Sequence, residues 1–414
     1  TSRLSSHGRK KDKIGKPCVD MSVLKTGIFI VAAKRTPFGA FGGKLANQSC
    51  TDLAEHASRA CLAESRLPPS AIDSVIFGNV CQSSKDTAYL ARHVCLRIGI
   101  PETTPAMSVN RMCGSGLQSV VSAAMEIAVG QSHVVLAGGA ENMSLAPFTL
   151  HGPRYGVRRA SDMLVGDVLW DTLTDYHINV NMAVTAENLA KRFNIGREEC
   201  DIYALRSQVQ WRLAQENGLF KKELVAVPFK DMKGKTGVLE TDEHPRETSM
   251  EALGKLKPAF QKGGVVTAGN ASGINDGAAA LIVASEELVR KAGIHPLARI
   301  VGFAVTGCDP SIMGIGPVSA ITRLMQAVDP NMVGCDVNKY CDLIEVNEAF
   351  AAQYLAVEKA LNLERTKTNI NGGAIAIGHP VGASGSRILG HLAHRLSEAS
   401  PQKMRAIGSA CIGG

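Results

Sequence analysis

The sequence lacks the features that would point to a membrane protein, a disulfide-bonded protein or a metalloprotein. No apolar run approaches the ~18 residues that a membrane-spanning helix needs. The eleven cysteines are scattered singly, without a C-x-x-C pair, and the closest two, Cys335 and Cys341, have the wrong spacing for a zinc site. We therefore expect reduced thiols of an intracellular protein, no integral membrane contact and no bound metal.

The body of the chain also has almost no excess charge. The 414 residues carry a formal net charge of +7, and residues 1–27, with seven Lys or Arg against two Asp, account for +5 of it. The rest offers no basic stripe for nucleic acid, so we expect no nucleic-acid partner. The basic tail, 1–27, is expected to be disordered. Its basic charge is typical of a mitochondrial leader. The alternative is that the native chain starts at Met21 and the preceding residues do not belong to it.

What the sequence does contain is an alternation of strand-like and helix-like segments. Short apolar runs alternate with segments whose apolar residues repeat at helical spacing. This alternation is typical of an α/β fold with largely buried strands. The expected strands span 28–33, 74–80, 105–110, 133–138, 280–284, 298–306, 342–347, 368–371 and 405–410, and the expected helices include 51–65, 116–130, 318–328, 348–361 and 384–397.

An internal repeat divides the chain into two related halves. Residues 73–79 resemble 342–347, and the asparagines that end the two segments are 268 positions apart. The Gly-Ser-Gly of 114–116 resembles the Ala-Ser-Gly of 383–385 at an offset of 269. A nearly constant offset indicates two copies of one strand–helix unit.

The repeat predicts the domain organisation. After the tail, an N-terminal half at 28–143 resumes at 273–295, and a C-terminal half spans 296–414. An inserted loop domain at 144–272 separates the two parts of the first half. Within the insertion we expect helices over 183–217 and an irregular loop over 228–248.

Cys113 lies between a strand-like and a helical segment, in Arg-Met-Cys-Gly-Ser-Gly. The free N–H groups and the positive dipole end of the following helix would favour a thiolate. Small neighbours would let a carbonyl group approach the sulfur. The pattern predicts a nucleophile, and the alternative is a buried cysteine at a glycine turn.

Three further segments have the pattern of active-site loops. Asn347 follows a buried strand, where it could fix a water or a carbonyl oxygen or simply cap a helix. His379 lies in the glycine-rich loop 371–385, and Pro380 biases it away from helical geometry; a structural glycine loop is the alternative. Cys411 follows the last apolar strand. The repeat brings these segments and Cys113 toward one pocket.

In this order, the four motifs resemble those of the thiolase family, over essentially everything from Met21 to Gly414. The segments 35–39, 267–273 and 307–314 add to the resemblance, and the last of them is most similar to the mitochondrial branch that acts on 3-ketoacyl-CoA. The implied fold has two repeated strand–helix halves with helices sandwiched between sheets, plus the inserted loop domain. The motifs are Cys113-Gly114-Ser115-Gly116, Asn347-Glu348-Ala349-Phe350, Gly378-His379-Pro380 with Gly382-Ala383-Ser384-Gly385, and Cys411-Ile412-Gly413-Gly414.

The resemblance implies thiolytic cleavage of 3-ketoacyl-CoA by coenzyme A in fatty-acid β-oxidation. By similarity, Cys113 attacks the keto carbonyl and keeps the shortened acyl group as a thioester, while His379 takes the thiol proton. Cys411 exchanges a proton with the departing acetyl-CoA. The enolate needs preorganised donors. The resemblance assigns one set to His379 with a water held by Asn347, and the other to the N–H groups of Cys113 and Gly413.

By the same resemblance, coenzyme A binds as a substrate on and beside the inserted segment. No other cofactor and no metal is expected. The family forms dimers or dimers of dimers, so we expect a homodimer or a homotetramer. The mitochondrial matrix is the expected location, with the cytoplasm as the alternative. The residues that match the family's coenzyme A contacts are Arg246, Ser272, Ala268, Met182 and Phe350.

Other functions remain open at this point. An acetoacetyl-CoA thiolase runs the same chemistry toward condensation, and an acyl-CoA hydrolase replaces coenzyme A by water. A non-catalytic lipid- or CoA-binding protein is disfavoured by the intact Cys113, His379 and Cys411. The second cysteine also disfavours the decarboxylating condensing enzymes. The family continues into a final apolar strand that this sequence, ending at Gly414, does not include.

Overall fold

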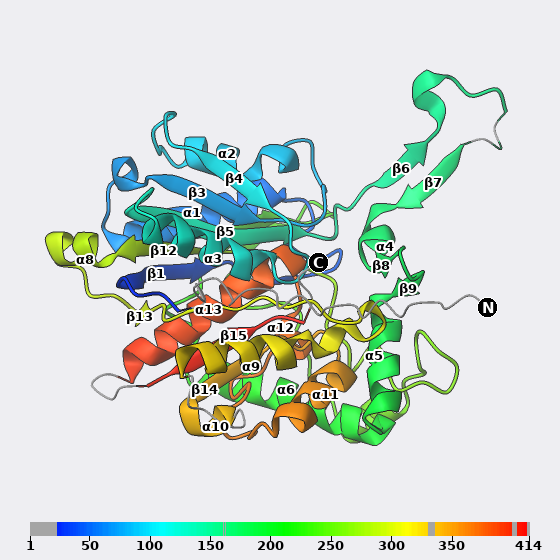
Figure 1. Cartoon of the computed structure of the whole chain (residues 1–414). Helices are drawn as coiled ribbons and strands as arrows, with labels where there is room; N and C mark the ends of the chain where they lie inside the picture. The colour runs from blue at the N-terminus through cyan, green and yellow to red at the C-terminus, as the bar shows by residue number, and fades with distance from the viewer. Residues whose placement is uncertain (1–22, 160, 162, 330–335, 400–403, 412–414) are drawn as a thin grey trace, which may run out of the picture.

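The computed structural model describes residues 23–159, 161, 163–329, 336–399 and 404–411. Among them, seven strands form a mixed sheet in the order β13-β1-β12-β5-β3-β4, with β2 paired to β12 (Figure 1). All of β5 is buried, which is the pattern of a sheet covered on both faces. The strands are β1 Ile28–Arg35, β2 Gly39–Ala40, β3 Ser74–Gly78, β4 Ala106–Val109, β5 Val134–Asn142, β12 Asn275–Ser285 and β13 Ala298–Arg299.

Helices cover both faces of this sheet. α1 (Cys50–Ser65) contacts β12 and β5 on one face and packs against α2 (Leu90–Arg97). α3 (Ser115–Ala128) and α13 (Val381–Glu398) cover the other face. α13 also contacts β14 and β15 of a second sheet, so α13 lies between two sheets, with α3 packed against it (Figure 1). The predicted α/β fold with sandwiched helices is therefore confirmed.

The second sheet belongs to the C-terminal half. It pairs β14 (Leu343–Val346) and β15 (Ala406–Ser409) in parallel, as β3 and β5 pair in the first half. The two pairs of strands are related by the sequence repeat. The surrounding helices are η5 Pro310–Ile315, α9 Gly316–Val328, α10 Val337–Tyr340, α11 Ala351–Leu361 and α12 Ala374–Ile377.

The segment between β5 and β12 contains an arm and a helical part. The arm, β6 and β7 with the turn between them, stands away from the body (Figure 1). The expected helices of 183–217 are α5 and α6. The elements are β6 Phe148–His151, η3 Pro153–Tyr155, β7 Leu164–Asp167, α4 Val168–Thr172, β8 Thr174–Asp175, β9 Val180–Asn181, α5 Met182–Arg192, α6 Arg197–Glu216, β10 Val227–Lys230, β11 Thr236–Leu239 and α7 Met250–Gly254. Shorter elements elsewhere are η1 Pro69–Ala71, η2 Thr87–Tyr89 and α8 Glu286–Ala292.

Three expectations about secondary structure were wrong. The strand expected at 298–306 is only β13, because the pairing of β1 with this segment ends at Ile300, whose N–H donates to Ile28. The strand expected at 368–371 is reduced to isolated bridges at Thr368 and Ile370, since Asn369 between them has a φ of 47°. The loop expected at 228–248 contains the β10–β11 hairpin. The domain boundaries stay predictions, and most of the basic tail, 1–22, lies outside the described residues.

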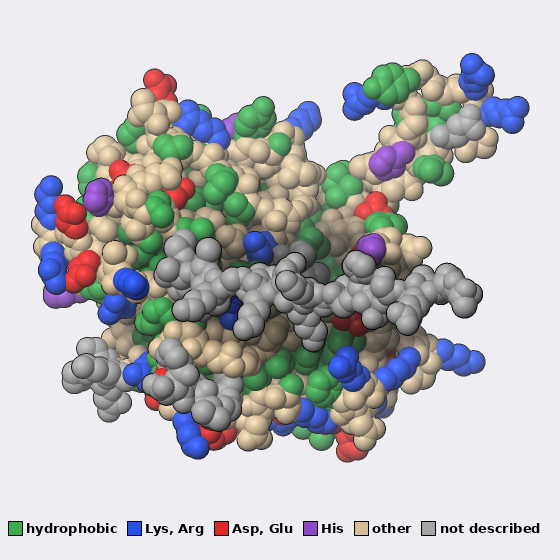
Figure 2. Space-filling view, in the orientation of Figure 1, with side chains coloured by type: hydrophobic (Ala, Val, Ile, Leu, Met, Phe, Trp, Pro, Cys, Tyr) green, Lys and Arg blue, Asp and Glu red, His purple; other side chains and the backbone are tan. Residues whose placement is uncertain are grey.

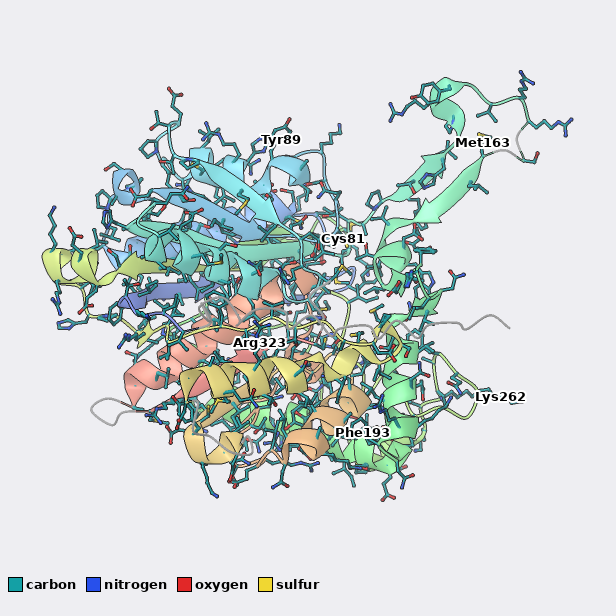
Figure 3. The ribbon with its side chains drawn as sticks, in the orientation of Figure 1. Cys81, Tyr89, Met163, Phe193, Lys262 and Arg323 are labelled. Carbon is teal, nitrogen blue, oxygen red and sulfur yellow. The ribbon has the colours of Figure 1, made fainter. Side chains whose placement is uncertain are left out.

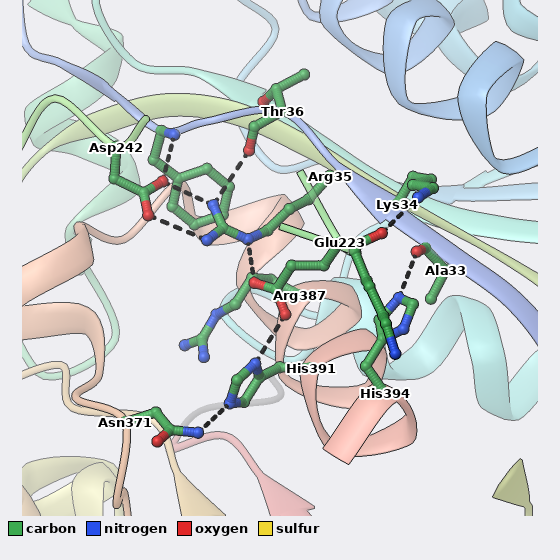
Figure 4. A network of polar contacts seen from close by, with 12 residues as sticks. Ala33, Lys34, Arg35, Thr36, Glu223, Asp242, Asn371, Arg387, His391 and His394 are labelled. Carbon is green, nitrogen blue, oxygen red and sulfur yellow. Dashed lines mark hydrogen bonds and ion pairs between the residues drawn. The ribbon is translucent and has the colours of Figure 1, made fainter. Parts of the chain in front are cut away.

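A buried ion network ties the insertion to both halves (Figure 4). Arg35, at the end of β1, donates to Glu223 at 2.6 Å and to both oxygens of Asp242 at 2.6 and 3.0 Å. The other Glu223 oxygen lies 2.7 Å from Nδ1 of His391 on α13. Glu223 and Asp242 both come from the inserted segment, so this network fixes the insertion against β1 and α13.

Candidate active site

Cys113 lies in the turn between β4 and α3, as predicted. Met112, directly before it, has a φ of 45°, which is uncommon for a residue other than glycine. The buried Ser115 hydroxyl braces the turn by accepting from Arg111 N–H at 2.8 Å and donating to the Met112 carbonyl at 2.6 Å. The backbone around the half-buried Cys113 is therefore held in one conformation.

His379 faces Cys113 from the other half of the molecule. It follows Gly378, whose φ of 102° ends α12 and turns the chain toward α13. Its Nε2 lies 3.1 Å from the Cys113 sulfur, and its Nδ1 lies 2.6 Å from the Ser384 hydroxyl. The side chain is buried, so these two contacts fix the ring.

The Ser384 hydroxyl selects the tautomer of His379. It donates to the Pro380 carbonyl at 3.0 Å, so its lone pair accepts from Nδ1–H of His379. This assignment leaves the Nε2 lone pair facing the Cys113 thiol. His379 is arranged to accept a proton from that thiol.

Asn347 lies beside the same ring nitrogen, at the end of β14. Its Nδ2 is 3.4 Å from Nε2 of His379, and its side chain is 1% exposed. Its Oδ1 has no hydrogen-bond partner within the described part of the chain. A buried amide oxygen without a partner is costly, so Asn347 suits a site completed by a water or a substrate.

Cys411 lies against Cys113. It is buried in a cluster with Met182, Met313 and Ala349, against which Cys113 and Phe350 pack. Two sequence-predicted coenzyme A contacts, Met182 and Phe350, are thus placed beside both thiols. Gly413 lies outside the described residues.

The electrostatics favour a neutral thiol and a neutral imidazole. A hydrogen bond with Cys411, together with burial, raises the pKa of Cys113 well above its usual range. Burial, helped by the charge of Arg387, lowers the pKa of His379 to about 3. The thiolate expected from the helix dipole is therefore disfavoured before substrate binds, because burial and the second thiol outweigh the dipole of α3.

The remaining coenzyme A candidates lie in the C-terminal part of the insertion. Ser272 N–H donates to Ala349 O at 3.0 Å, beside the cysteine cluster. Arg246 donates through Nη2 to Ala268 O at 2.8 Å, and both residues are exposed. The candidates therefore run from the buried thiols to the surface.

Glu348 is a structural support rather than a reacting group. Its carboxylate is fully buried and accepts from Tyr203 at 2.7 Å, Ser207 at 2.6 Å and Asn369 at 3.0 Å, and from Ile375 N–H at 3.2 Å. The contacts join α6, the loop after β14 and α12. Glu348 thereby fixes the position of the backbone at Asn347, the residue directly before it.

Sequence reasoning missed two residues of this site. Ser384 was noticed only as part of the repeat and of a family motif, although a hydroxyl near one helical turn beyond His379 is a signal for a ring partner. Met313 lies in the segment 307–314 that adds to the family resemblance, but only the packing shows that it lies beside the two thiols.

Within the described ranges, no cluster of His, Cys, Asp or Glu could hold a metal ion. No helix in those ranges is long and apolar enough to cross a membrane.

Comparison with known proteins agrees with the geometry. The thiolase N-terminal domain matches residues 28–287, and the thiolase C-terminal domain matches 294–414. The mitochondrial 3-ketoacyl-CoA thiolase of Bos taurus is 55% identical over 395 residues, which cover 95% of this chain and 97% of that protein.

Solved structures are equally similar. The crystal structure of human mitochondrial 3-ketoacyl-CoA thiolase in complex with CoA has a TM-score of 0.88 and 53% identity, covering 94% of this chain and 96% of that one. The acetyl-CoA acetyltransferase of Bacillus anthracis has a TM-score of 0.88 and 43% identity, covering 95% and 97% of the two chains. With both halves matched and Cys113, Asn347, His379 and Cys411 gathered at one site, the chain belongs to the thiolase family.

Proposed function

We propose that the protein cleaves 3-ketoacyl-CoA with coenzyme A, giving acetyl-CoA and a shortened acyl-CoA in fatty-acid β-oxidation. The observation that carries the proposal is the 3.1 Å contact between the Cys113 sulfur and Nε2 of His379, with Cys411 hydrogen-bonded to the same thiol. The mitochondrial 3-ketoacyl-CoA thiolases are more similar to this chain than the Bacillus acetyltransferase, which supports the degradative reaction.

In the first half-reaction, the Cys113 sulfur attacks the 3-keto carbon as its proton moves to Nε2 of His379. The bond between C2 and C3 then breaks, and its electron pair stays on C2 as the enolate of acetyl-CoA. Cys411 protonates C2 and recovers a proton from His379. The acyl group remains on Cys113 as a thioester.

In the second half-reaction, the coenzyme A thiol gives its proton to His379 and attacks the thioester carbon. The bond to Cys113 breaks, and His379 returns the proton to the Cys113 sulfur. Two thiols suit this sequence, because one stays acylated while the other exchanges a proton.

Charge that develops on oxygen needs fixed donors, each worth about 3–4 kcal/mol. The assigned donors are His379 with a water held by Asn347, and the N–H groups of Cys113 and Gly413. The buried, unpartnered Oδ1 of Asn347 supports a water at the first position.

Coenzyme A is assigned to the line of residues from the thiols to the surface. The CoA complex of the human relative supports this substrate. Met182 and Phe350 would contact its thiol end, Ser272 and Ala268 the middle, and Arg246, an exposed cation, the phosphate-bearing end.

The protein is further assigned a homo-oligomeric state, a dimer or a tetramer. The arm exposes Phe148 by 73%, Leu164 by 68% and Val165 by 72%, and its apolar and basic side chains stand clear of the body (Figure 2). Met163, on the same arm, also lies far from the body (Figure 3). A second copy of the chain would cover these side chains and the open edge of β4.

The names of the bovine and human relatives, which include the word mitochondrial, support a mitochondrial location. The compartment that we propose within the mitochondrion is the matrix.

The test of the proposed reaction is loss of absorbance from a medium-chain 3-ketoacyl-CoA and from acetoacetyl-CoA on adding coenzyme A. Wild type should cleave the longer substrate, and Cys113→Ala should not. Cleavage of acetoacetyl-CoA alone would indicate the condensing type of thiolase. Release of free acid without added coenzyme A would indicate a hydrolase.

A further inference from the structure

One buried side chain outside the reacting groups holds the backbone of His379. Asn275, the first residue of β12, is completely buried, and its Oδ1 accepts from His379 N–H at 3.1 Å. Its Nδ2 donates to the Gly39 carbonyl at 2.8 Å, while its backbone pairs with Ala40 of β2. Both ends of the amide are thus satisfied, one toward the sheet of the N-terminal half and one toward the histidine loop.

Two glycines leave the space that this amide fills. A Cβ at Gly378 would lie 2.3–2.6 Å from the amide atoms of Asn275, closer than real contacts allow. A Cβ at Gly273 would lie 2.6 Å from Asn275 Oδ1 and 2.2 Å from Cε1 of His244. The amide is therefore closely packed on both sides and has one position.

The contact matters because Cys113 and His379 belong to different halves. Cys113 follows β4, which belongs to the same sheet as β12. His379 lies on a loop of the C-terminal half, and Ser384 fixes only the direction of its ring. Asn275 holds that loop in a fixed position relative to the sheet that carries Cys113.

We propose that Asn275 is a positioning residue for His379, which sets the distance between the imidazole and the Cys113 thiol. This inference rests on the proposed role of His379 as the base. Misplacement of a reacting group by about 1 Å can cost about 100-fold in rate, so loss of this hydrogen bond should affect proton transfer more than substrate binding.

The test compares Asn275→Ala with a matched variant, Asn338→Ala. Asn338 is also buried, donates to Asn362 O at 2.8 Å and accepts from Glu364 N–H at 2.9 Å, but it lies on α10, away from the site. For each folded variant we would measure kcat, KM for both substrates, the melting temperature and the rate of Cys113 alkylation by iodoacetamide. The alkylation assay needs no bound substrate.

Asn275→Ala should lower kcat and the alkylation rate by about tenfold or more, with KM changed less than about threefold. Asn338→Ala should lower the melting temperature without changing kcat. Equal kcat and alkylation rates in wild type and folded Asn275→Ala would overturn the inference. If His379→Ala retains activity, the role of His379 as the base fails instead, and if wild type does not cleave 3-ketoacyl-CoA, the proposed function fails.

A second variant keeps the test decisive if Asn275→Ala does not fold. Asn275→Asp retains an oxygen for His379 N–H and places a carboxyl group against the backbone of His379. The ring of His379 itself contacts Cys113, Asn347 and Ser384 and is within range of the charge of Arg387. A carboxylate at position 275 raises the pKa of His379. The acid limb of the pH profile of kcat should therefore move to higher pH. An unchanged acid limb would contradict the contact between residue 275 and His379.

Discussion

The Nε2 atom of His379 lies 3.1 Å from the Cys113 sulfur, across a sequence separation of 266 residues. Because the pair starts neutral, attack by sulfur requires His379 to accept the proton at the same time. His379→Ala should lower kcat by 10²–10⁴-fold, the range for loss of a general base. Single-turnover formation of the acyl–enzyme measures this step. Normal acylation in the variant would remove His379 from it.

Ser384→Ala should lower kcat by about 10-fold to 100-fold, with a smaller change in KM. The variant removes the acceptor for Nδ1–H and leaves a buried donor unpaired, at a cost of about 1–3 kcal/mol. The ring is then free to take the other tautomer, with Nε2 protonated against the thiol. Ser384→Thr, which keeps the hydroxyl, is the control. Full activity of Ser384→Ala would show that the tautomer is fixed by something else.

Arg35→Met should lower the free energy of unfolding by about 3–5 kcal/mol, because the buried carboxylates of Glu223 and Asp242 lose their cation. Urea unfolding gives the difference. The matched control is Arg59→Met. It breaks an exposed i,i+4 pair with Glu55 and should change stability by less than about 1 kcal/mol. Equal effects of the two variants would contradict the importance of burial.

Acid stability should depend on His244. Burial and the charge of Arg246 lower its pKa from 6.5 to about 4. Between these values the unfolded chain binds a proton that the folded protein does not, so this group makes stability fall as the pH falls. His244→Gln removes the contribution.

The melting temperature of His244→Gln minus that of wild type should therefore rise as the pH is lowered from 7 to 5. Asn338→Ala, which removes no titratable group, is the control, and its difference from wild type should stay constant. A constant difference for His244→Gln as well would show that His244 does not titrate differently on folding.

Sequence patterns predicted which side chains come together at the site, because each lies in a short local motif. Cys113 and His379 are set in glycine-rich turns, and Asn347 follows a buried strand. The contacts of Arg35 with Glu223 and Asp242 could not be predicted from a local motif, because these partners are 188 and 207 residues away in the sequence. The β10–β11 hairpin was missed because its strands are largely exposed, so they lack the continuous apolar run of the buried strands. The contact of Asn275 with His379 likewise exists only once the two halves pack.

The close contact of α3 with α13 has a consequence for how such proteins can diverge. A Cβ at Gly116 would lie 2.5 Å from Ser386 N, and one at Gly385 would lie 2.4 Å from Leu117 N. The backbones of α3, which follows Cys113, and α13, which follows His379, are therefore in direct contact. Mutation has little freedom there, whereas the inserted segment touches this junction at few points. Among related proteins, we therefore expect substitutions to accumulate in the insertion rather than at this junction.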